Sequence, residues 1–147
     1  MTTSAHNDST QTTTKPSRDQ DFLLLAARIL LMLLFVLFGL KKLIAFSATS
    51  DYMAATGVPV PMLATAVAVV MELVVGLLIA LGIRVQLLSL ILAAYTLFTA
   101  FIGHHYWTMS GMEQYMNMIN FYKNLSIAGG LILLSAVGAG KYRVFKK

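Results

Sequence analysis

The stretch FLLLAARILLMLLFVLFGL, residues 22–40, decides the fold class, because Arg28 is its only charged residue. At about 1.5 Å per residue, a helix of this length covers most of the ~30 Å hydrocarbon core of a bilayer. Three more apolar runs follow it along the chain. The sequence therefore predicts an all-α membrane protein, a four-transmembrane-helix bundle with spans at about 22–46, 61–81, 85–107 and 119–137.

The composition supports a membrane protein and excludes several other classes. Hydrophobic residues make up 58% of the 147 residues and charged residues only 12%, about half the ~25% share that is usual in soluble domains. The chain cannot supply the charged surface of a soluble enzyme or of a nucleic-acid-binding module. There is no cysteine, so the chain alone cannot build a disulfide, a thiolate nucleophile or an iron–sulfur cluster.

The ends of the chain are polar and its connectors are short. Residues 1–21 have the composition of a disordered tail, residues 22–140 form the predicted membrane domain, and residues 141–147 form a basic tail. Gly82-Ile83-Arg84 is so short a turn that the second and third spans must form an antiparallel hairpin. A cleaved signal ending near residue 47 is the alternative for the first run, whose length is greater than the usual 7–15 residues of a signal's apolar region.

The basic residues are distributed unequally between the two ends of the predicted bundle. Four spans place both termini on one side. That side holds seven basic residues and the other side holds three, namely Lys15, Arg18, Arg84, Lys141, Arg143, Lys146 and Lys147 against Lys41, Lys42 and Lys123. Basic residues are enriched in cytoplasmic segments, so we predict that both termini are cytoplasmic.

Glu72 is the strongest single candidate for a functional residue. It lies roughly 15–16 Å from either end of its span, near the bilayer midplane. A charge at that depth costs at least ~2.5 kcal/mol, so such a residue usually has a partner or a function. Small residues on the same helix face predict that it points into the bundle. They recur every four positions, as Ala64, Ala68, Gly76 and Ala80.

Two roles for Glu72 stay open at this point. It is either a catalytic proton carrier or a neutral structural residue that is hydrogen-bonded to a neighbouring helix. Arg28 lies about 5 Å from it in depth, which predicts a structural ion pair between Arg28 and Glu72. Lys42 lies nearer the outer face and is the less suitable direct partner. The alternative for Arg28 is that its guanidinium extends to the cytoplasmic surface.

A second group of candidate residues lies near the outer face. Lys42, His104 and Lys123 fall at similar depths on three different spans, with Asn124 and Trp107 beside them. Ammonium, imidazole and aromatic groups at one end of a bundle would suit a quinone or another apolar molecule with carbonyl oxygens. The alternative for each residue alone is an interfacial anchor.

Methionines beside the two outer histidines raise a further alternative. Thioether and imidazole groups together suit copper(I). An amphipathic segment lying in the interface explains the same pattern more simply, and we predict no metal site. The residues concerned are Met109, Met112, Met116 and Met118, beside His104 and His105.

An ordered set of short motifs resembles the DoxX family of small prokaryotic membrane proteins, over about residues 22–140. The motifs are Arg28-Ile-Leu, FGLKKL (38–43), YMAATGVPVP (52–61), MELVVGLLIALGIR (71–84), HHYW (104–107) and FYKNLSIAGGLILL (121–134). The resemblance implies a four-helix domain in the bacterial inner membrane. It also implies a link to membrane redox processes, because the family includes the DoxD subunit of thiosulfate:quinone oxidoreductase and proteins named as quinol oxidase subunits.

Together these observations predict a multi-pass membrane subunit of a redox complex that interacts with quinone or quinol. Glu72 would handle protons, and Lys42, His104 and Lys123 would hold the head group. The sequence contains no intrinsic redox centre, so electrons would come from a soluble or membrane partner protein or from a soluble substrate. The alternative is a non-catalytic membrane scaffold or a carrier of a small apolar solute. Whether the chain is an enzyme, and whether it forms oligomers, stays open.

Overall fold

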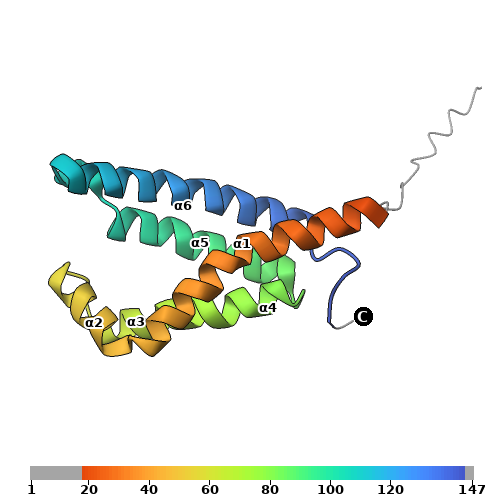
Figure 1. Cartoon of the computed structure of the whole chain (residues 1–147), viewed down its shortest axis with the longest axis horizontal. Helices are drawn as coiled ribbons and strands as arrows, with labels where there is room; N and C mark the ends of the chain where they lie inside the picture. The colour runs from red at the N-terminus through yellow and green to blue at the C-terminus, as the bar shows by residue number, and fades with distance from the viewer. Residues whose placement is uncertain (1–17, 145–147) are drawn as a thin grey trace, which may run out of the picture.

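The computed structural model describes residues 18–144, and every regular element in that range is a helix (Figure 1). The elements are α1 Arg18–Ile44, α2 Phe46–Ala55, α3 Pro61–Val69, the π-helical η1 Val70–Val75, α4 Gly76–Ala80, α5 Val85–Gly103, the 3₁₀ turn η2 Tyr106–Thr108 and α6 Gly111–Val137. Three helical stretches are long and apolar enough to cross a membrane, namely Arg18–Ile44, Pro61–Ala80 and Val85–Thr108. The predicted all-helical membrane architecture is confirmed at this level.

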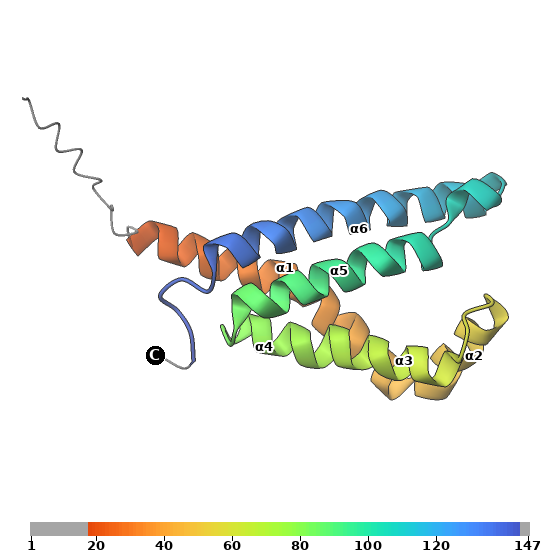
Figure 2. The ribbon, with the colours of Figure 1, turned by 180° about the vertical axis from the view of Figure 1, so that it is seen from behind.

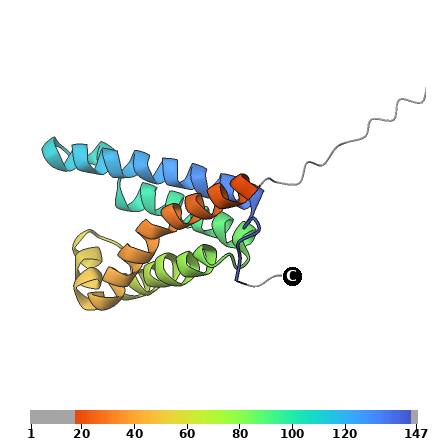
Figure 3. The same ribbon diagram turned by 45° about the vertical axis from the view of Figure 1, so that its right-hand side comes forward.

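The helices form two pairs that pack against each other at one end. α5 and α6 run side by side, and α1 packs against the continuous helix made of α3, η1 and α4 (Figures 1 and 2). The two pairs diverge toward the end that carries α2 (Figure 3). The core lies where they meet, and its buried members are Met32, Phe35, Ile79, Val85, Leu92, Ala93, Leu131 and Leu134.

The start of the first span differs from the prediction. α1 begins at Arg18, so residues 18–21, which we predicted to be part of a disordered tail, are helical. Asp19 and Asp21 lie in the first turn, where negative side chains stabilise a helix through its dipole. The rest of the predicted tail, residues 1–17, lies outside the described residues, as do residues 145–147.

The predicted connector after the first span contains a helix of its own. α1 ends at Ile44, and α2 begins at Phe46 after a break at Ala45, whose ψ of 43° is not helical. α2 packs on α3. Gly57, with φ of +78°, and the following prolines then stop the helix, and Pro61 is the first residue of α3 as expected.

The last connector and the C-terminal tail also differ from the prediction. α5 ends at Gly103 and α6 begins at Gly111, so most of the predicted polar connector is the first part of α6. After α6, the predicted basic tail does not begin as a free segment. The N–H of Val144 donates to the carbonyl of Leu81 at 3.0 Å, which fixes residues 138–144 across the end of the bundle. We call residues 138–144 the C-terminal strap.

Candidate functional site

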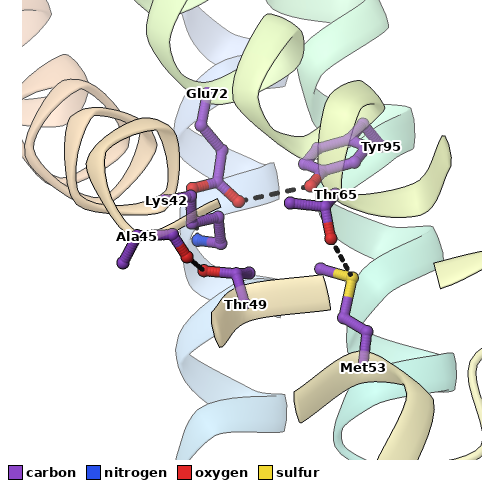
Figure 4. A network of polar contacts seen from close by, with 7 residues as sticks. All are labelled: Lys42, Ala45, Thr49, Met53, Thr65, Glu72 and Tyr95. Carbon is purple, nitrogen blue, oxygen red and sulfur yellow. Dashed lines mark hydrogen bonds and ion pairs between the residues drawn. The ribbon is translucent and has the colours of Figure 1, made fainter. Parts of the chain in front are cut away.

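Three helices contribute side chains to one carboxylate inside the bundle. Lys42 on α1 places its Nζ 2.6 Å from Glu72 Oε2. Tyr95 on α5 donates its hydroxyl to Glu72 Oε1 at 3.2 Å (Figure 4). The side chains of Lys42 and Glu72 are 24% and 13% exposed. We call Lys42, Glu72 and Tyr95 the polar triad; it confirms that Glu72 faces neighbouring helices rather than lipid.

A glycine brings the ion pair together. An added Cβ at the buried Gly39 would lie 2.5 Å from the backbone nitrogen of Leu73 and 2.9 Å from the carbonyl carbon of Glu72. The backbones of α1 and η1 are therefore in direct contact at this crossing. Lys42 is three residues after Gly39 and lies on the same helix face, so its ammonium group reaches Glu72 across the contact.

The helix that carries Glu72 is distorted at this crossing. Residues Val70–Val75 form a π-helical turn between α3 and α4. Such turns have i→i+5 hydrogen bonds, are rare in helices and occur frequently at functional sites. Glu72 thus lies on a widened turn whose backbone is in direct contact with α1 at Gly39.

Further polar groups extend from the polar triad toward α2. The buried hydroxyl of Thr65 lies 2.9 Å from the carbonyl of Pro61 and 3.4 Å from the sulfur of Met53. Thr49 on α2 donates to the carbonyl of Ala45 at 2.9 Å. Figure 4 shows these groups on the side of Glu72 and Tyr95 that faces α2.

Arg28 does not pair with Glu72, so the predicted ion pair is wrong. Its side chain is only 2% exposed. Its Nη1 and Nη2 donate to the carbonyls of Ala139 and Tyr142, both at 2.6 Å. The C-terminal strap offers these acceptors at the depth of Arg28, whereas Lys42 already neutralises Glu72. For the same reason Arg28 does not extend to the surface.

The predicted outer group does not form around one ligand. His104 Nδ1 lies 3.0 Å from Asn117 Oδ1, and the exposed Lys123 donates to Asn120 at 2.8 Å. Within residues 18–144, no hydrogen bond or ion pair joins any two of Lys42, His104 and Lys123. The sequence grouped the three residues because they lie at similar depths. In the structure, Lys42 points inward to Glu72, and His104 and Lys123 belong to the α5–α6 pair.

The remaining predicted residues lie on the α5–α6 pair as well. Trp107 is exposed and belongs to an aromatic cluster, with its ring centroid 5.8 Å from that of Phe121 and 5.4 Å from that of Tyr106. Asn124 is half-buried on α6. Met112 and Met116 are exposed on the first turns of α6. The described part of the chain contains no group of three or more His, Asp or Glu residues that could hold a metal ion.

Tyr95 is the member of the polar triad that sequence reasoning missed. It lies ten residues after Val85 on a helix without charged residues, or about 15 Å into the span. Glu72 lies at the same depth. A buried tyrosine hydroxyl usually finds a hydrogen-bond partner. Tyr95 could therefore have been predicted as a partner of Glu72, the only carboxylate predicted near the midplane.

The polar triad lies in the part of the chain that matches a known protein family. Residues 23–105 match the DoxX family model, a range that contains Lys42, Glu72 and Tyr95. The inner membrane protein YphA of Escherichia coli K12 is 51% identical, over 80% of this chain and 84% of its own length. The E. coli inner membrane protein YqjF is 37% identical, over 85% and 91%.

A eukaryotic relative is more distant. The ER-derived vesicles protein ERV29 of Saccharomyces cerevisiae is 26% identical, over 90% of this chain but 36% of its own length. No solved structure matches the chain.

Proposed function

The chain belongs to the DoxX family and is a multi-pass inner-membrane protein, and from this premise we propose that it binds quinone or quinol as a membrane subunit of a redox complex. The polar triad would be the binding centre. One observation carries the proposal: a carboxylate deep in a membrane helix accepts from an ammonium group at 2.6 Å and from a phenol at 3.2 Å.

The residues of the triad fit the chemistry of a quinone head group. The ammonium of Lys42 and the hydroxyl of Tyr95 can donate to carbonyl oxygens, and Glu72 can accept or return a proton. A bound quinone would supply two-electron redox chemistry, with the electrons exchanged with a partner.

Protonation of Glu72 would control access to these donors. While Glu72 is ionised, Lys42 and Tyr95 both donate to it. When Glu72 takes up a proton, its attraction for the ammonium group falls, and both donors become free to bind another oxygen. The triad would thereby couple proton uptake at the carboxylate to binding of a carbonyl-bearing ligand.

We also propose that α6 is a fourth span and that both termini are cytoplasmic. The backbone N–H of Lys141 donates to Asp21 Oδ1 at 3.0 Å, so the chain after α6 returns to the end where α1 begins. A chain that starts and ends on one side crosses the membrane an even number of times. α6 is 27 residues long and runs beside α5 (Figure 1), and the excess of basic residues at this end supports a cytoplasmic location.

The quinone proposal is tested by extraction and by binding. The purified protein should yield quinone on organic extraction and should bind a quinone analogue, measured by fluorescence quenching. Lys42→Met and Tyr95→Phe should each weaken binding roughly five- to tenfold, the effect of one lost hydrogen bond of about 1–1.4 kcal/mol. Lys41→Met is the matched control, because it removes the adjacent exposed ammonium group, and it should leave binding unchanged.

Two outcomes would contradict the proposal. If His104→Gln weakened binding as much as Lys42→Met, the head group would bind near the outer face and not at the triad. If no analogue bound the unmodified protein in several lipid compositions, the alternative of a non-catalytic scaffold or a carrier of small apolar solutes would replace the quinone proposal.

A further inference from the structure

A second candidate site lies at the opposite end of the bundle from α2, under the C-terminal strap. Figure 2 shows the strap leaving the end of α6 and passing toward the end of α4. A hollow opens between the strap and the helices. It is lined by Leu25 and Arg28 of α1, by Ala80 and Leu81 at the end of α4, and by residues 141–144.

The charges around this hollow are all of one sign. Arg28, Lys141 and Arg143 line it, and no acidic residue of the described chain does. Asp21, which accepts the backbone N–H of Lys141, does not line the hollow. The guanidinium of Arg28 has only backbone carbonyls as partners, and its buried Nε makes no hydrogen bond within residues 18–144. A buried charge without an opposite charge is costly. An anion bound in the hollow would therefore be attracted by these positive charges.

The rest of the lining is mainly apolar. Leu81 and Val144 are exposed large hydrophobic residues, and Leu25 and Ala80 are half-exposed. Exposed apolar side chains of this kind suit contact with lipid acyl chains. An anion that also carries an apolar chain therefore fits both parts of the lining, and a small soluble anion fits only one.

We propose that this hollow binds the phosphate of an anionic phospholipid, with Lys141 and Arg143 at the head group and the acyl chains against Leu25, Leu81 and Val144. The site is separate from the polar triad and does not depend on the proposed quinone function. Gly82 permits it, because an added Cβ there would lie 2.7 Å from the Cβ of Arg143. The close approach of the strap to this turn keeps Arg143 at the rim.

The test uses the full chain, purified in detergent and titrated with phosphatidylglycerol or phosphatidylcholine of equal chain length. Native mass spectrometry counts the bound lipid, and thermal unfolding reports stabilisation. We expect phosphatidylglycerol to bind more tightly than phosphatidylcholine. Lys141→Gln and Arg143→Gln should each weaken its binding about fivefold, and the double variant roughly twenty-fivefold, because each removes one direct hydrogen bond to the phosphate.

Matched controls separate a site from general surface charge. Arg84→Gln removes a basic residue that is exposed at the same end but does not line the hollow, and it should bind phosphatidylglycerol as the unmodified protein does. Inorganic phosphate should not displace the lipid. Equal binding of the two lipids, an Arg84→Gln effect as large as that of Arg143→Gln, or complete displacement by inorganic phosphate would each overturn the proposal.

Discussion

The ion pair between Lys42 and Glu72 predicts a specific pattern of unfolding free energies. Glu72→Gln keeps the size of the side chain and an acceptor oxygen but removes the negative charge. The ammonium of Lys42, 24% exposed in the native protein, would then lack its counter-charge inside the bundle. The free energy of unfolding should fall, because the native state retains an unneutralised charge.

The size of this loss follows from the burial of the two partners. Removing one member of a fully buried pair costs ~3–5 kcal/mol. Lys42 lies two residues before the end of α1, so its flexible stem can carry the ammonium group toward the membrane surface and relieve part of the cost. We therefore expect a loss of about 2 kcal/mol for Glu72→Gln.

A double-mutant cycle separates this pair from its alternatives. Unfolding is followed in detergent for Glu72→Gln, Lys42→Met and the double variant, which should recover most of the loss, because neither charge remains. The matched control is the same cycle with Arg28→Met. Arg28 donates to the carbonyls of the C-terminal strap, so its effect should add to that of Glu72→Gln within ~0.5 kcal/mol. Additivity in the Lys42 cycle, or coupling in the Arg28 cycle, would refute the assignment.

Two further predictions concern the helix crossing and the topology. Gly39→Ala should destabilise the protein by about 1–3 kcal/mol in detergent unfolding, because its Cβ would collide with the backbone of η1. Gly129→Ala, whose Cβ would meet nothing within 4 Å, should be neutral or stabilising, and equal effects of the two would exclude the close crossing. A reporter that is active only outside the cytoplasm should be inactive when fused after Lys147 and active after Ser110; the reverse pattern would reverse the orientation.

The apolar runs of the sequence were sufficient to predict the long helices of the membrane domain, but not α2 or the first part of α6. Length and the near absence of charge identify such segments directly, because the bilayer imposes a minimum length on them. Pro61 at the start of α3 and the short turn after Leu81 were predictable for a similar reason, since each depends on local backbone geometry. The inward orientation of Glu72 was predictable because the alternative, a charge facing lipid, is costly.

The partners of the charged residues were not predictable by the same means. Counting residues along a helix gives depth, whereas a contact also requires the rotation of each helix and the crossing between them. By depth alone, Arg28 was the nearer candidate partner of Glu72 and Lys42 the less suitable one. Lys42 is the partner of Glu72 because α1 crosses η1 at Gly39 and because Arg28 donates to the C-terminal strap, which overlaps the predicted basic tail at residues 141–144.

The π turn of η1 explains why Glu72 and Gly76 both face α1. In an α-helix, residues four apart drift by about 40° for each step, so a four-residue stripe slowly leaves a neighbouring helix. A π turn has i→i+5 hydrogen bonds and holds more residues in one turn, which counteracts that drift. Glu72 consequently meets Lys42, while an added Cβ at Gly76 would lie 3.4 Å from Phe35 on the same helix α1. The polar triad therefore depends on two backbone features, the contact at Gly39 and the π turn, that position a carboxylate between α1 and α5.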